Sequence, residues 1–313
     1  MDKQSKIILI SGPTASGKSN FATKIAKKIN GEIINADSMQ VYKQLKILTA
    51  RPNKEDQNNI KHHLYGIIDL KKNFSTGQWL KAAKNKIKEI RNRKKIPILV
   101  GGTGLYFQSL INGLVKIPEI PLKFRNEIRL TQKKIGQEKF YKQLLKIDPK
   151  IKNKFDPNDI QRTIRAFEIK SYTKISMYEW IKKTKPEFKD DEFLKLYIDS
   201  KREELIKRIS LRVTKMMEDG AIKEVKKFIK LRIKKELSVN RVIGIDELTQ
   251  YLVGKINLDQ AKELITIKTR QYAKRQATWA RSRMTYWEKI NPTKIADYIK
   301  KLNKSSVKLD QLT

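Results

Sequence analysis

The stretch KIILISGPTASGKS at residues 6–19 decides the fold of this chain. Residues 7–10 form a continuous aliphatic run, which is typical of a strand buried on both faces of a parallel sheet. A glycine-rich turn follows at once, and residues 19–29 have the apolar spacing of a helix. The stretch therefore predicts a strand, a tight turn and a helix in succession, as at the start of an α/β sheet.

The turn itself matches the pattern G-x-x-x-x-G-K-[ST], in the strand-to-helix context that the pattern requires. In such a loop, Gly12 and Gly17 let backbone amides converge on phosphate oxygens, and the start of the helix adds positive potential. Lys18 supplies a cation, and the hydroxyl of Ser19 is a ligand for Mg²⁺. The alternative is a glycine-rich turn that binds no ligand. We expect phosphate binding by the whole loop: Gly12, Pro13, Thr14, Ala15, Ser16, Gly17, Lys18 and Ser19.

Further apolar runs at residues 32–36, 96–100 and 194–198 extend the predicted sheet. The first run ends at Asp37, and the second ends in the turn GGTG at residues 101–104. Strands that alternate with helices form parallel sheets, in which ligands bind beyond the carboxyl ends of the strands. The fold class is therefore α/β, with a parallel sheet core, and we expect these polar ends to lie near the phosphate loop.

The composition changes after Asn112-Gly113, where strand signals stop and lysine-rich helical periodicity begins. Asp156-Pro157 has the pattern of a helix N-cap followed by proline at the first helical position, which predicts a helix with Ile160 and Ile164 facing inward. Long helices are predicted from Glu203 and from Leu258. We therefore divide the chain into a core of residues 1–112 and 193–313, with C-terminal helices, and a mainly helical insertion domain of residues 113–192.

The formal charge is +37, from 70 Lys and Arg against 33 Asp and Glu. This excess favours an anionic partner such as nucleic acid. However, the charge is spread along the chain and Lys outnumbers Arg 54 to 16, so compositional background explains it equally well. No stretch approaches the roughly 20 apolar residues that span a bilayer, and we expect no membrane association. The absence of cysteine excludes disulfides and thiol catalysis, and makes a cytoplasmic enzyme the default expectation.

Asp37 is the one carboxylate placed near the loop by these patterns. A Mg²⁺ ligand, a general base and a helix N-cap are equally open roles for it. An ATPase or GTPase usually adds a strand that ends in Asp to hold Mg²⁺, whereas here the strand at 96–100 ends in Gly101-Gly102. This difference argues against a motor-type NTPase.

Seven blocks in this order resemble the bacterial tRNA dimethylallyltransferase family, also called tRNA isopentenyltransferases, and the resemblance runs from Gly12 to about Arg283. The blocks are GPTASGKS at 12–19, DSMQVY at 37–42, TARP at 49–52, HHL at 62–64, GGTGLY at 101–106, QRTIR at 161–165 and KRQATWAR at 274–281. The resemblance implies a P-loop NTPase-like core with a helical insertion. It also implies transfer of a dimethylallyl group from dimethylallyl diphosphate to N6 of an adenosine beside the anticodon, with release of diphosphate.

This chemistry implies roles for individual residues. The loop would hold the diphosphate of the donor with Mg²⁺, and Lys18 would stabilise the charge that grows on the leaving group. Asp37 matches the family's general base, which the poorly nucleophilic amine requires. Thr103 matches a position near the reacting groups, although a polar residue in a tight turn is its alternative role. Arg208 and Arg212 match basic positions four residues apart on one helix; we choose Arg208 as a second diphosphate contact, and a solvated basic face is the alternative.

The resemblance implies a second partner, the anticodon stem-loop of tRNA, whose target base must leave its stack. Residues 270–283 contain five basic residues, no acidic residue and two interleaved aromatic residues, which favours single-stranded RNA. Trp279 either stacks on a base or packs in the core. We expect the protein to act as a monomer. The tRNA contacts that we expect are Asp37, Ser38, Met39, Gln40, Arg125, Gln161, Arg162, Arg165, Arg241, Lys274, Arg275, Trp279 and Arg281.

The sequence departs from the family at Asp246, where a basic residue is common, so an RNA contact there is in doubt. The C-terminal zinc finger of eukaryotic relatives is missing. His62 and His63 are the only histidines, and we interpret them as packing or turn residues rather than a metal pair. Two other functions stay open: an isopentenyltransferase that acts on free adenine nucleotides, and a P-loop ATPase or small-molecule kinase.

Overall fold

The computed structural model of the chain describes residues 6–294 and 297–298. Its centre is a six-stranded sheet in the order β3-β2-β4-β1-β5-β6, in which every neighbouring pair is parallel. The predicted α/β class with a parallel sheet core is therefore confirmed. The strands are β1 (Ile7–Ser11), β2 (Gly31–Asn35), β3 (His62–His63), β4 (Ile96–Gly101), β5 (Phe193–Ile198) and β6 (Glu288–Ile290).

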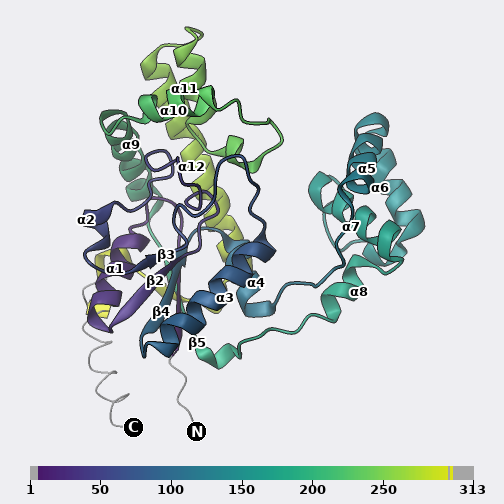
Figure 1. Cartoon of the computed structure of the whole chain (residues 1–313), viewed down its shortest axis with the longest axis horizontal. Helices are drawn as coiled ribbons and strands as arrows, with labels where there is room; N and C mark the ends of the chain where they lie inside the picture. The colour runs from purple at the N-terminus through teal and green to yellow at the C-terminus, as the bar shows by residue number, and fades with distance from the viewer. Residues whose placement is uncertain (1–5, 295–296, 299–313) are drawn as a thin grey trace. The chain divides into compact units, whose positions relative to one another are not determined.

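Helices cover both faces of the sheet, with α1 (Lys18–Lys28) on one side and α3 (Thr76–Asn92) on the other (Figure 1). Phe21 and Ile25 of α1 pack on Ile8 and Ile10 of β1, which are alternate residues of the strand and so face the same way. Ser75 starts α3 through a capping box with Gln78. The aliphatic run of β1 is fully buried because both of its faces are covered.

A second apolar cluster lies beside the sheet and is formed by the loop after β2 and the C-terminal helices. Within it, Leu45 and Leu48 of that loop pack with Val213, Leu248 and Ile265. The packing fixes the loop that starts at Asp37. The other helices of this unit are α2 (Lys54–Gln57), α4 (Gly104–Asn112), α9 (Arg202–Glu218), α10 (Ala221–Lys230), α11 (Ile245–Leu252) and α12 (Leu258–Arg283).

The chain separates into two compact units, residues 1–109 with 188–313 and residues 110–187. The predicted boundaries, after residues 112 and 192, lie three and five residues further along the chain than the observed ones. Residues 1–5, 295–296 and 299–313 of the predicted core lie outside the described residues. In the second unit, Ile128, Phe140 and Ile164 form a small core between three helices. Its helices are α5 (Leu122–Ile135), α6 (Gln137–Ile147), α7 (Ile160–Thr173) and α8 (Met177–Lys182). Within the described residues, no helix combines the length and apolarity that crossing a membrane requires.

The predicted start of the helix at residue 157 is wrong. Asp156 uses its side chain to accept from Asn158 N at 2.8 Å, which closes a turn, and Asp159 is the residue that caps α7 by accepting from Arg162 N at 3.0 Å. As a result, Ile160 is the first helical residue and is exposed, whereas Ile164 is buried as predicted.

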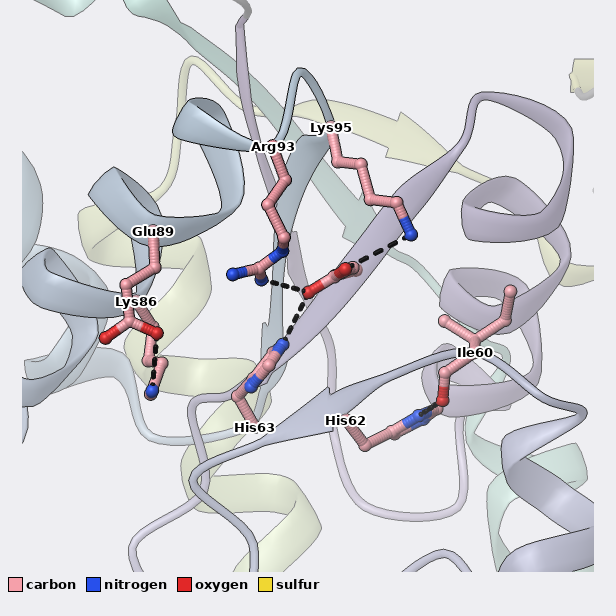
Figure 2. Close-up of polar contacts among 8 residues, drawn as sticks. Ile60, His62, His63, Lys86, Glu89, Arg93 and Lys95 are labelled. Carbon is pink, nitrogen blue, oxygen red and sulfur yellow. Dashed lines mark hydrogen bonds and ion pairs between the residues drawn. The ribbon is translucent and has the colours of Figure 1, made fainter.

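The interpretation of His62 and His63 as packing or turn residues is incomplete, because the two residues form the edge strand β3. His63 Nε2 lies 2.7 Å from Oε2 of Glu32, a buried carboxylate near the start of β2 (Figure 2). Arg93 Nη2 lies 2.6 Å from the same oxygen, and Lys95 Nζ lies 3.2 Å from Oε1. Burial raises the pKa of Glu32, but the hydrogen bonds from these three partners outweigh it and lower the pKa to about 2.

This cluster predicts a specific acid dependence of stability. A carboxyl with a pKa of about 2 when folded and 4.5 when unfolded stabilises the fold above pH 4.5, and this contribution is lost as the pH falls toward 2. We expect Glu32→Gln to lower the free energy of unfolding in urea at pH 7 by about 3 kcal/mol, because it breaks a buried ion cluster. The difference from wild type should shrink between pH 4.5 and 2. Glu89→Gln, which removes an exposed partner of Lys86, is the control and should change little. A difference that is constant with pH would contradict this role for Glu32.

Candidate active site

The loop between β1 and α1 has the backbone of an anion-binding turn. Gly17 is the N-cap of α1 and has a φ of 86°, and Ala15 has a φ of 63°. Ser16 N donates to Pro13 O at 3.2 Å, which closes the turn. Alternation of left-handed and right-handed residues creates a concave row of amides that suits phosphate oxygens, next to the positive end of α1.

Two cations lie at this loop. Lys18 Nζ donates to Pro13 O at 3.2 Å, and Arg212 Nη1, from α9, donates to the Thr14 hydroxyl at 3.0 Å. Burial lowers the pKa of Lys18 to about 8; the charge of Asp37 opposes this shift, and that of Arg212 adds to it. A bound anion would relieve the cost of holding these two positive charges together.

Arg208, which we predict to contact the diphosphate, lies one turn before Arg212 on α9. It lines a cavity of about 540 Å³ that the phosphate loop also lines, together with Lys24 of α1. Its guanidinium lies 3.4 Å from Glu204 Oε2 on the same helix. Arg212 is thus the arginine that touches the loop, and Arg208 is placed at the cavity beside it.

Asp37 is held at the carboxyl end of β2 by a rigid turn. Its amide donates to Asn35 Oδ1, and its own Oδ1 accepts from Met39 N, both at 2.9 Å. Asn35 is buried and also donates to the carbonyls of Asp37 and Leu64. Among the described residues, Oδ2 of Asp37 makes no hydrogen bond, so one carboxylate oxygen can act on a ligand. The charge of Asp37 also raises the pKa of Tyr106 and Tyr272, after the larger effect of burial.

The GGTG turn after β4 lies against the Asp37 loop. Thr103 N donates to Ala36 O at 3.2 Å, and Ser38 N donates to the Thr103 hydroxyl at 3.0 Å. A Cβ at Gly101 would lie 2.0 Å from the Ala36 carbonyl oxygen, so only glycine fits. The hydroxyl of Thr103 thus fixes the backbone next to Asp37. A second cavity, of about 280 Å³, opens between this turn and α12, and Gly12, Ser38, Thr103, Tyr272, Arg275, Gln276 and Trp279 are among its lining residues.

Gln276 of α12 is a site residue that residue type and spacing alone do not reveal. Its Oε1 accepts from Thr14 N at 2.8 Å, and its Nε2 donates to Gly102 O at 3.0 Å. The side chain therefore joins the phosphate loop to the GGTG turn. Its position inside the KRQATWAR block was the available signal, but an uncharged amide on a basic helix does not reveal which loops it reaches.

We expect Gln276→Ala to weaken the binding of inorganic diphosphate about 10-fold, measured by titration calorimetry. The loss corresponds to about 1.4 kcal/mol, the scale of one or two lost hydrogen bonds that hold the loops. Gln271→Ala, at an exposed position on the same helix, is the matched control and should bind diphosphate as wild type does. An affinity equal to that of wild type in Gln276→Ala would show that the loop keeps its shape without this bridge.

Four of the expected tRNA contacts lie on α12 of the core unit. Lys274, Arg275 and Arg281 are exposed on α12, with the Arg275 guanidinium 5.9 Å from the centroid of Tyr272. Trp279 lines the second cavity, where its ring leaves no room for a Cβ at Gly104.

Several other expected contacts serve the local structure. Met39 packs on the second apolar cluster, while Gln40 Nε2 donates to the carbonyls of Thr49 and Ala50 and so ties the TARP loop to the Asp37 loop. Arg241 is exposed after α10. Asp246, the departure from the family pattern, is exposed and lies 3.4 Å from Lys268 Nζ.

The remaining expected contacts belong to the second unit. Gln161 is exposed, and Arg162 Nε lies 3.3 Å from Asp159 at the start of α7. Arg125 and Arg165 both contact the buried Glu168. The expected tRNA contacts therefore belong to both compact units of the chain.

Comparison with known proteins identifies the family of the chain. The sequence profile of the family described as IPP transferase matches residues 40–283. The chain is 75% identical to a protein named tRNA dimethylallyltransferase from Pelagibacter ubique (strain HTCC1062), over all 313 residues and the full length of both chains.

Two solved structures are also similar. One is the full-length tRNA isopentenylpyrophosphate transferase from Bacillus halodurans, with a TM-score of 0.69 and 32% identity, covering 98% of this chain and 99% of that one. The other is a eukaryotic dimethylallyltransferase acting on tRNA, with a TM-score of 0.77 and 34% identity, covering 88% of this chain and 70% of that one. By its sequence, its P-loop sheet and the extent of these matches, the chain belongs to the IPP transferase family, among relatives named tRNA dimethylallyltransferase.

Proposed function

We propose that this chain transfers a dimethylallyl group from dimethylallyl diphosphate to N6 of an adenosine next to the anticodon of tRNA, and releases diphosphate. The observation that carries the proposal is the placement of Asp37. Its carboxylate has one oxygen without a hydrogen bond among the described residues, and its charge opposes the lowering of the pKa of Lys18 in the phosphate loop. A base and an anion site at one end of the sheet suit displacement of diphosphate by an amine.

On the donor side, the loop amides of residues 12–19, Lys18 and Arg212 bind the diphosphate. Arg208 adds a second contact from the larger cavity. As the C–O bond breaks, negative charge grows on the diphosphate, and cations already fixed at the loop stabilise it without reorganising. The allylic carbon carries the matching positive charge until the N–C bond forms.

On the acceptor side, Asp37 accepts the proton from N6 of adenine as the new bond forms. The amine needs this help because its lone pair is delocalised into the ring, and a positioned base contributes about 10²–10⁴-fold to the rate. Thr103 keeps the backbone of Ser38 in place and lines the second cavity. In this proposal its hydroxyl lies beside the reacting amine.

The residues of the loop fit Mg²⁺ as a cofactor. Among the described residues, no group of three or more His, Asp or Glu side chains forms a metal cage. Mg²⁺ needs none here, because it is usually held by one or two protein oxygens, by substrate phosphates and by water. Ser19, at the first turn of α1, would supply the hydroxyl ligand, and the ion would neutralise charge on the diphosphate.

We propose that the tRNA is bound by both units. Arg275 and Trp279 of α12 line the second cavity, whereas Lys274 and Arg281 are exposed on the same helix. Arg241 lies on the same unit. Arg125, Gln161, Arg162 and Arg165 belong to the insertion. In this proposal the enzyme acts in the cytoplasm as a monomer.

One assay tests the proposed function. The protein is incubated with Mg²⁺, labelled dimethylallyl diphosphate and one acceptor, either tRNA that lacks the modification or AMP, and ATP hydrolysis is measured in parallel. We expect label in tRNA alone. Label in AMP would indicate the isopentenyltransferase of free nucleotides, and ATP turnover without any transfer would indicate a P-loop ATPase. Either result contradicts the proposal.

A further inference from the structure

A buried carboxylate lies among three arginines in the second unit. Glu168 of α7 is 1% exposed, and its Oε2 lies 2.9 Å from Arg165 Nη1 and 3.3 Å from Arg125 Nε. Its Oε1 lies 3.6 Å from Arg129 Nε. Arg165 belongs to α7, whereas Arg125 and Arg129 lie one turn apart on α5. One carboxylate therefore gathers guanidinium groups from two helices.

The exposed part of this cluster is cationic. The side chains of Arg125, Arg129 and Arg165 are 35%, 46% and 40% exposed, while the carboxylate between them is out of contact with solvent. Three positive charges against one negative charge leave an excess of two. Each guanidinium has five N–H donors, and Glu168 has only two oxygens, so donors remain for another acceptor. The unit as a whole has 19 basic and 9 acidic residues, so its surroundings add to the positive potential.

Holding the arginines in advance favours binding of a rigid polyanion. A mobile arginine loses rotamer freedom when it binds, at a cost of about 0.5–1.5 kcal/mol for each side chain. Arginines that are already held by a buried partner lose much of this rotamer freedom on folding, so they lose less of it on binding. Planar guanidinium groups also match phosphate oxygens in a bidentate way. Three such groups gathered from two packed helices offer several donors for the phosphates of a nucleic acid backbone.

We propose that Glu168 is a positioning residue, and that Arg125, Arg129 and Arg165 form a site for backbone phosphates of the tRNA substrate. The inference rests on the proposed function and deepens it, because it assigns Arg129 to the RNA surface and explains what orients all three side chains. Glu168 itself does not contact the RNA.

The substitution Glu168→Gln separates an effect of positioning from an effect of net charge, because the two effects predict opposite changes in affinity for tRNA. Removal of a negative charge makes the unit more basic, so charge alone predicts equal or tighter binding. Loss of the carboxylate releases the arginines, so positioning predicts weaker binding. We expect the Kd for an unmodified tRNA transcript to be about 10-fold higher in Glu168→Gln than in wild type. The slope of log Kd against log salt concentration should also fall by at least about one unit, as phosphate contacts are lost.

Two further variants complete the test. Glu138→Gln makes the same charge change at an exposed residue of α6 that pairs with Lys142, and it should bind tRNA at least as tightly as wild type. Arg129→Gln removes one guanidinium but leaves Glu168 paired, so it decides the phosphate site even if Glu168→Gln does not fold. It should lower the salt slope by about one unit.

The outcomes are distinct from those of the function assay. Transfer of label to tRNA by wild type establishes the function whatever the variants do. If wild type does transfer label, two results would overturn the inference alone. One is a folded Glu168→Gln variant whose Kd for tRNA and salt slope are unchanged. The other is an unchanged salt slope in Arg129→Gln. Absence of transfer by wild type overturns the proposed function instead.

Discussion

Replacement of Asp37 by alanine should lower the turnover number for tRNA prenylation by at least about 10²-fold, while affinity for dimethylallyl diphosphate stays within a small factor of wild type. In the proposed mechanism Asp37 takes the proton from the acceptor amine, and a positioned base contributes about 10²–10⁴-fold to the rate. The proposed contacts of the donor are the loop, Lys18 and Arg212, so loss of Asp37 should leave donor binding largely intact. Single-turnover rates and donor Kd, measured separately, distinguish the two effects.

Alanine also removes a structural hydrogen bond, because Asp37 Oδ1 accepts from Met39 N. Asp37→Asn is the matched control, since the amide oxygen of asparagine can accept from Met39 N but asparagine cannot act as the base. We expect both variants to lose turnover to a similar extent. An asparagine variant with nearly normal turnover would identify Asp37 as a turn residue instead.

Replacement of Lys18 by methionine should lower kcat/KM for the donor by about 10²–10³-fold. Methionine keeps much of the length of the side chain but removes the charge that stabilises diphosphate, and loss of one preorganised donor to a developing anion has this size of effect. Lys27→Met, at an exposed position near the end of α1, is the control and should retain kcat/KM. A loss of less than 10-fold in Lys18→Met would show that Arg212 and the loop amides suffice.

The same lysine predicts a pH dependence. Burial lowers the pKa of Lys18 to about 8 in the enzyme without donor, so the ammonium is charged below this pH and loses its proton above it. Only the charged form attracts diphosphate. We expect kcat/KM for the donor in wild type to fall as the pH rises through about 8, and this limb to be absent from Lys18→Met. A wild-type profile that is flat up to pH 9.5 would contradict the expectation.

Local patterns allowed most of the core to be predicted. The strand and the phosphate loop at residues 6–19 depend on residues close together in the chain. The edge strands β3 and β6 were missed because two or three residues are too few for a periodic signal. The helix start at Asp159 was misplaced because Asp156 closes a turn of its own.

The site contacts that were not predicted join residues far apart in the sequence. Gln276 bridges two loops that lie more than 170 residues away in the chain, and Arg212 reaches Thr14 from a helix almost 200 residues later. Glu168 resembles any helical glutamate until α5 packs beside it. Residue type and spacing therefore predict which loops carry the chemistry, whereas the partners of each side chain depend on packing between elements.

The stoichiometry of the products tests the central claim most directly. Wild-type protein is incubated with Mg²⁺, dimethylallyl diphosphate and unmodified tRNA, and the released diphosphate, the inorganic phosphate and the prenylated adenosine in digested tRNA are measured together. A phosphate loop that holds a leaving group for transfer predicts one diphosphate for each adenosine prenylated at N6, with no inorganic phosphate. Release of inorganic phosphate, or of diphosphate without prenylated adenosine, would contradict it.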